Sequence, residues 1–187
     1  NNGTGDQNIT LHATGATFVL TAGNGTGVYG GPPDSCREGL GGTLASCANL
    51  IASNVALVQG RGTNQTIDFV NGGTLTLTGG SGGNNNQAVI YHSGTGNQAI
   101  TGGANMSLTA GAGGVYIRDL DYLLGNHAQV TTNGFQAINA GSLSLTGGTS
   151  GASRAQIFAG MDSQTITATG SVSLYGGATN LVSSYYG

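Results

Sequence analysis

Apolar and polar residues alternate in five short segments of the chain. Each segment holds two apolar residues separated by one residue, and four of the five intervening residues are Ser or Thr. The five apolar pairs are Phe18/Leu20, Leu75/Leu77, Met106/Leu108, Leu143/Leu145 and Val172/Leu174. Successive side chains of a β-strand point to opposite faces, so the pattern predicts five strands that are apolar on one face. The opposite face carries Val19, Thr76, Ser107, Ser144 and Ser173.

Each alternating strand belongs to a longer unit that occurs five times. A Gln followed two residues later by Ile precedes the pair, at Gln7/Ile9, Gln65/Ile67, Gln98/Ile100, Gln136/Ile138 and Gln164/Ile166. A third β-rich run follows it, at Val55-Ala56-Leu57, Val89-Ile90-Tyr91, Val115-Tyr116-Ile117, Ile157-Phe158 and Leu181-Val182. Glycines between the runs permit sharp bends. The unit is therefore three short strands joined by glycine-bearing corners.

A unit this small cannot bury its own apolar face, whereas stacked units share one core. The sequence therefore predicts an all-β fold, a parallel β-solenoid (β-helix) of about five three-strand coils, in one domain spanning 1–187. Equivalent residues of successive coils would lie above one another. The five Gln of the units are then expected to form a ladder of amide hydrogen bonds, as stacked Gln does in cross-β assemblies. The alternative is that Gln merely tolerates a corner.

Two segments interrupt the repeat. The first, 24–53, contains Pro32-Pro33 and the only cysteines, Cys36 and Cys47, and its part 38–53 has apolar residues at helical spacing. The second is a minor insertion at 119–133. With no other sulfur ligand for zinc, we expect a Cys36–Cys47 disulfide rather than two free thiols. A disulfide predicts an oxidising location, which is outside the cytoplasm.

Composition and charge argue against several classes of fold and of binding partner. Only 6% of residues are charged, and 37 of 187 are Gly, which argues against a coiled coil or a solvated helical bundle. Four scattered arginines form no basic stripe, so no nucleic acid partner is expected. No apolar run has the length of a membrane span, so no membrane insertion is expected.

The residues that could catalyse a reaction or bind a metal do not share a position in the repeat. The acidic candidates Asp68, Asp119, Asp121 and Asp162 fall at different phases of the repeat, whereas the active sites of parallel β-helix enzymes need carboxylates on one face. The three histidines share no repeat position and are interpreted as unrelated surface residues. We therefore predict that the chain is not an enzyme, with no catalytic or metal-binding residues and no cofactor.

The segments 64–67 and 73–80, and the segment 141–148, resemble repeats of bacterial secreted and surface β-helix proteins. The most similar group is the filamentous haemagglutinin-type adhesins exported by two-partner secretion. The resemblance implies an extracellular, right-handed parallel β-helix that serves as a stalk, fibre or adhesin. It supplies no catalytic residues for this chain.

The predicted function is a structural subunit of an extracellular or cell-surface fibre, sheath or adhesin stalk. Its expected partner is itself, because coil-forming sequence without polar caps leaves open ends that fit head to tail. The expected interface joins Leu181, Val182, Tyr185 and Tyr186 of one subunit to Gln7, Ile9, Phe18 and Leu20 of the next.

Other functions remain open. One alternative is a segment of a larger adhesin that binds host or surface glycans through its insertion loops. A third possibility is a polysaccharide-acting β-helix enzyme or an ice-binding solenoid. Ice binding needs the same Thr pair on successive coils, and the outward column centred on Thr76 is mainly Ser.

Overall fold

The computed structural model describes residues 5–24, 54–81, 86–117, 122–149, 153–160 and 163–177. All regular elements in these ranges are β-strands, which confirms the all-β class. They are β1 (Gln7–Leu11), β2 (Ala16–Thr21), β3 (Asn54–Gly60), β4 (Gln65–Phe69), β5 (Gly73–Thr78), β6 (Asn86–His92), β7 (Asn97–Thr109), β8 (Gly114–Ile117), β9 (Tyr122–Gly125), β10 (Ala128–Thr132), β11 (Phe135–Thr146), β12 (Ala155–Ala159), β13 (Gln164–Ala168) and β14 (Val172–Tyr175).

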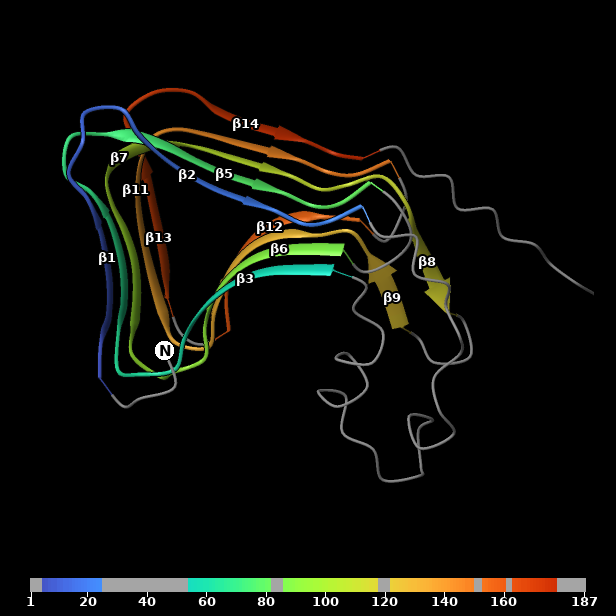
Figure 1. Cartoon of the computed structure of the whole chain (residues 1–187), viewed down its shortest axis with the longest axis horizontal. Helices are drawn as coiled ribbons and strands as arrows, with labels where there is room; N and C mark the ends of the chain where they lie inside the picture. Colours follow the sequence, from blue (N-terminus) through green and yellow to red (C-terminus); the bar gives the residue numbers. More distant parts are fainter. Residues whose placement is uncertain are drawn as a thin grey trace, which may run out of the picture.

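The strands form two main sheets with parallel pairing. In the larger sheet, β1, β4, β7, β11 and β13 pair in that order, and β2, β5, β7, β11 and β14 pair alongside them. The second sheet has the order β3, β6, β10 and β12. The long strands β7 and β11 take part in both rows of the larger sheet, so Figure 1 shows that sheet bent into two walls, with the second sheet facing them. The apolar interior lies between the three rows.

The strand register places equivalent residues of the sequence units side by side. Gln7 pairs with Gln65, and this row continues through Gln98, Gln136 and Gln164. The apolar pairs match in the same way, from Phe18/Leu20 through to Val172/Leu174. We call the successive units repeats: β1–β3 form the first, β4–β6 the second, β7 and β10 the third, β11 and β12 the fourth, and β13 and β14 the fifth.

The core follows the period-two pattern. Leu75, Leu77 and Leu108 are fully buried, whereas the residues between them, such as Thr76, face outward. The second sheet contributes its own inward column, in which Ile90 and Val130 are fully buried. Burying one such side chain stabilises a fold by about 1.5 to 3 kcal/mol. The middle repeats supply most of the fully buried residues.

Glycine is required at the bend between the two walls of the larger sheet. Gly102 has a φ of +85°, which L side chains rarely adopt, and a Cβ at this residue would lie 1.9 Å from the carbonyl oxygen of Phe69. Both the backbone conformation and the close approach of the neighbouring repeat therefore exclude a side chain here. The bend allows one strand to belong to both walls.

The third strand of the third repeat corrects the sequence prediction. Val115-Tyr116-Ile117 lies in β8, which pairs antiparallel with β9 in a separate hairpin. The strand that pairs with β6 is instead β10, with Ala128 beside Ala88 and Val130 beside Ile90. Residues 128–132, which the sequence assigned to the minor insertion at 119–133, thus belong to the second sheet. The interruption is the segment that contains the β8–β9 hairpin.

Several predictions fall outside the described residues. Most of the 24–53 insertion does, including Cys36, Cys47 and the segment 38–53 with helical spacing. The same holds for Leu181, Val182, Tyr185 and Tyr186.

Candidate functional site

The five glutamines form a continuous ladder inside the larger sheet. In each step, the Nε2 of the later repeat donates to the Oε1 of the earlier one. The donor–acceptor distances are 2.7 Å from Gln65 to Gln7, 2.7 Å from Gln98 to Gln65, 2.6 Å from Gln136 to Gln98 and 2.5 Å from Gln164 to Gln136. All four bonds have the same direction along the stack.

The ladder also ties the larger sheet to the second sheet. Nε2 of Gln98 donates to the carbonyl oxygen of Thr131 at 3.0 Å, and Gln65 and Gln7 make the corresponding bonds to Tyr91 and Gln59. Gln65, Gln98 and Gln136 are buried, so their amides would be costly to leave unpaired. The ladder therefore links successive repeats to one another and the larger sheet to the second sheet.

A second polar ladder lies where the strands of the second sheet begin, and it was not predicted from the sequence. Nδ2 of Asn54 donates to Oδ1 of Asn86 at 3.1 Å. The backbone N–H of Asn86 donates to Oδ1 of Asn126 at 2.8 Å, and that of Asn126 donates to Oγ of Ser153 at 3.0 Å. Asn86 and Asn126 are fully buried. These side chains satisfy backbone groups at the corner where each repeat enters the second sheet.

Outward residues of β2, β5, β7, β11 and β14 form an array of hydroxyl groups. One column contains Thr76, Ser107, Ser144 and Ser173, with Val19 at its start. A neighbouring column contains Thr21, Thr78, Thr109 and Thr146, with Tyr175 at its end. We call these two columns the hydroxyl face. The sequence analysis recognised the first column and missed the second.

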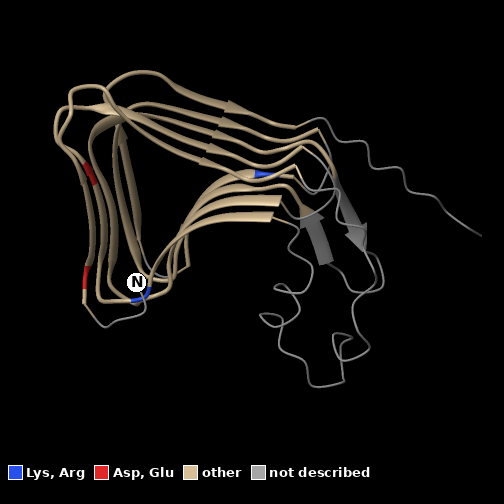
Figure 2. Cartoon of the chain, in the orientation of Figure 1, with Lys and Arg blue, Asp and Glu red and all other residues tan. Residues whose placement is uncertain are grey.

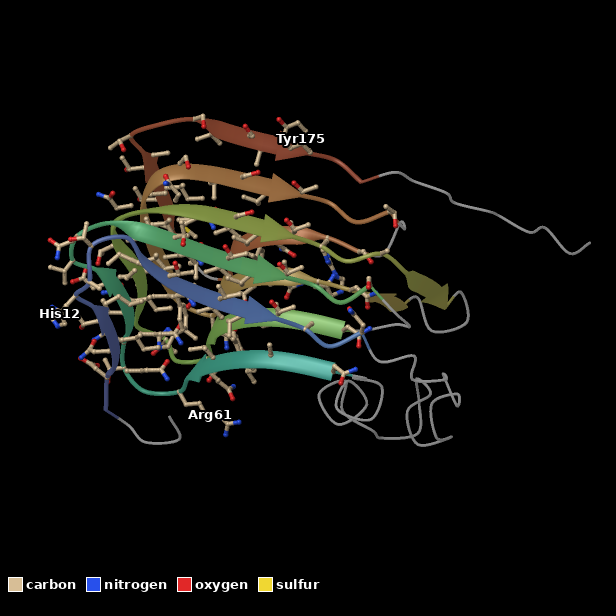
Figure 3. All side chains as sticks on the ribbon, turned by 45° about the horizontal axis from the view of Figure 1, so that its top comes forward. His12, Arg61 and Tyr175 are labelled. Atoms are coloured by element: carbon tan, nitrogen blue, oxygen red, sulfur yellow. The ribbon has the colours of Figure 1, made fainter. Side chains whose placement is uncertain are left out.

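Apolar side chains of the two end repeats are exposed or only partly buried. In the fifth repeat, Leu174 is 70% exposed and Val172 is 56% exposed, although their equivalents Leu77 and Leu75 in the second repeat are fully buried. In the first repeat, the expected interface residues Ile9, Phe18 and Leu20 are only partly buried against the core. Figure 3 places Tyr175 of the fifth repeat and Arg61, just after β3 of the first, at opposite edges of the stack.

Two of the three histidines, expected at the surface, are buried. His92 is fully buried, with Nε2 3.1 Å from the carbonyl oxygen of Gly62 and Nδ1 3.3 Å from Oγ1 of Thr132. The carbonyl can only accept, so Nε2 carries a proton and donates to Gly62. Two more polar groups are thus satisfied within the stack. The third histidine, His12, is exposed at the end of β1 (Figure 3).

His127 is nearly fully buried beside the fourth repeat. Its Nδ1 accepts the backbone N–H of Arg154 at 3.4 Å. Burial, and to a lesser degree the Arg154 cation, lower the pKa of His127 from its ordinary 6.5 to about 4. The fold therefore holds this imidazole neutral.

We expect His127 to make the fold acid-sensitive. The folded-state pKa is depressed, so the unfolded chain binds the extra proton first as pH falls. The contribution is fully present above pH 6.5 and is lost progressively down to about pH 4, where the cost reaches about 3 kcal/mol. Urea denaturation of the wild type at pH 7.5, 5.5 and 4 should show this loss beyond that of a His127→Gln variant. Coincident pH profiles of the two proteins would contradict the assignment.

The described part of the chain contains no group of three or more His, Cys, Asp or Glu residues placed to hold a metal ion. No helix in these ranges has the length and apolar character needed to span a bilayer.

Comparison of the chain with protein-family models, with curated proteins and with solved structures finds no match. The resemblance to filamentous haemagglutinin-type adhesins therefore rests on the repeat segments alone.

Proposed function

We propose that this chain is a structural β-solenoid that builds an extracellular fibre, sheath or adhesin stalk by head-to-tail stacking of its end repeats. The observation that carries the proposal is the exposure of core positions at the fifth repeat, above all Leu174 at 70%. Apolar residues that belong to a core in the middle of the stack lie uncovered at its end. Another repeat placed there would bury them.

The two ends offer complementary strand edges. At one end, β1 and β2 each pair with a single described neighbour, and at the other end the same holds for β13 and β14. Such edges present unpaired backbone N–H and C=O groups to a further strand. If β1 of one copy stacks on β13 of another in the register used inside the chain, Ile9 lies beside Ile166. In the same register Phe18 lies beside Val172.

The ends of the Gln ladder are complementary as well. Among the described residues, none donates to Oε1 of Gln164, and Nε2 of Gln7 donates only to the carbonyl oxygen of Gln59. One end therefore offers an acceptor and the other a donor. A head-to-tail junction would extend the ladder by one more hydrogen bond. Such a contact propagates into a filament unless its rotation closes a ring.

Self-association of the purified chain tests this proposal. Sedimentation velocity and electron microscopy over a range of concentrations should detect filaments or high-mass species. Leu174→Arg should weaken the association by about 100-fold or more, because a charge desolvated in an apolar junction costs several kcal/mol and each 1.4 kcal/mol is a factor of ten. Phe135→Arg is the matched control, since Phe135 is 42% exposed, points outward and lies on β11, which is paired on both sides.

Two outcomes would overturn the stacking arrangement. A wild-type chain that stays monomeric at high concentration would favour the alternative, a segment of a larger adhesin that binds surface glycans. Filaments that form equally well from Leu174→Arg would mean that the junction lies elsewhere.

A further inference from the structure

The hydroxyl face contains a column of stacked Thr beside the mainly Ser column centred on Thr76. Its second column holds Thr at four successive positions, Thr21, Thr78, Thr109 and Thr146, each paired directly with the next. Threonine is stiff about χ1, so its hydroxyl and methyl groups hold fixed positions on a strand. The pairing has no register shift among these residues; the shifts between β7 and β11 lie earlier, between Ile138 and Leu143.

The spacing of the two columns follows from strand geometry. Paired strands lie about 4.8 Å apart, and alternate residues along a strand lie about 6.7 Å apart. The hydroxyl groups therefore occupy a two-dimensional lattice rather than a single line. A repeat of this size is similar to that of the water oxygens on a prism face of hexagonal ice.

The hydroxyl groups are available to an external partner. Thr76, Ser107 and Ser144 make no side-chain hydrogen bond to any described residue, and the same is true of Thr78, Thr109 and Thr146. None of these oxygens is buried without a partner, so water reaches all of them. First-shell water bridges protein hydroxyl groups to a ligand with hydrogen bonds that are nearly as favourable as direct ones.

The face carries no charged residue. The outward positions of both columns are Ser or Thr apart from Val19 and Tyr175, and Figure 2 shows the walls containing β2, β5 and β14 without charged positions. An uncharged lattice suits a neutral crystalline surface and offers no cation to pair with a phosphate. Flat polysaccharides are usually bound by stacking on aromatic rings, and only Tyr175 at the edge provides one.

We infer that the hydroxyl face binds ice, with the Thr column that contains Thr109 and the Ser hydroxyl groups of the first column together taking the place of a uniform Thr pair. The ligand is the water lattice of an ice crystal, which meets the Ser and Thr hydroxyl groups through ordered water. The inference is independent of head-to-tail stacking, because the two columns lie on the side of the stack and the junction lies at its ends.

Ice-affinity partitioning of the purified 187-residue chain tests the inference. A slowly growing ice front should incorporate the wild-type protein, and the protein should shape ice crystals and produce thermal hysteresis. Thr76→Lys, which places a long charged side chain in the first column, should abolish these effects. Thr66→Lys is the matched control, because Thr66 also points outward from the second repeat, in β4, and makes no side-chain hydrogen bond to a described residue.

Circular dichroism establishes that each variant retains the wild-type β content. Should Thr76→Lys fail to fold, Ser107→Tyr serves as the second disruption of the same column. Exclusion of the wild type from ice would overturn the inference. Unchanged binding by a folded Thr76→Lys or Ser107→Tyr would also overturn it, and so would equal loss in Thr66→Lys.

Discussion

Leu143→Asp is expected to prevent the chain from folding. Leu143 is 4% exposed and packs in the common core of the three strand rows. The substitution removes a buried leucine, which costs about 2 to 5 kcal/mol, and adds a carboxylate that costs several kcal/mol more when it has no partner. A domain is typically stable by about 5 to 15 kcal/mol, so the sum can exceed the whole stability.

The neighbouring position supplies the control. Ser144 lies on the same strand, β11, but points outward, so Ser144→Asp should keep the fold. Far-UV circular dichroism should report β structure for Ser144→Asp and an unfolded spectrum for Leu143→Asp. Folding of both variants would mean that the period-two assignment of inside and outside is wrong on this strand.

Gln98→Leu is expected to destabilise the fold by about 4 kcal/mol. The side chain of Gln98 is almost fully buried and bonds to Gln65 on one side and Gln136 on the other. Leucine would leave the Oε1 of Gln65 without its donor and one Nε2 proton of Gln136 without its acceptor. Each buried polar group left unpaired costs about 1 to 3 kcal/mol.

Urea denaturation at neutral pH measures this loss. Gln129→Leu is the control, because Gln129 lies on the outward side of β10 and makes no side-chain hydrogen bond to a described residue. Its stability should stay within about 0.5 kcal/mol of the wild type. Similar effects of the two substitutions would show that the amide ladder adds nothing beyond ordinary packing.

The repeats of the larger sheet could be predicted because their pattern is strong. Strict alternation around pairs such as Leu75/Leu77 sets which face is buried, and the regular Gln sets the register. The strands of the second sheet were harder to predict from the sequence. Their inward residues include Ala, as at Ala88 and Ala128, and a small residue carries a weak strand signal.

A usable signal for the second sheet was nevertheless present. Asn or Ser stands two residues before an inward Ala, with Val or Ile two residues later, in the segments that begin at Asn54, Asn86, Asn126 and Ser153. Val115-Tyr116-Ile117 lacks that Asn and Ala, although its own residues favour a strand. Tertiary pairing therefore outweighed local propensity. The Thr column that contains Thr109 was also visible, one residue beyond four of the five apolar pairs.

The uniform direction of the Gln ladder gives the molecule an electrical polarity. Successive backbone carbonyls of a β-strand point in opposite directions, so their dipoles largely cancel along the stack, whereas the five side-chain amides all point the same way. Aligned amide dipoles add, as they do along a helix, with the positive end here at Gln7 and the negative end at Gln164. Hydrogen bonds in such a row also polarise one another. Two copies that meet through like ends would therefore repel, so this polarity favours one orientation for every subunit of the proposed stack.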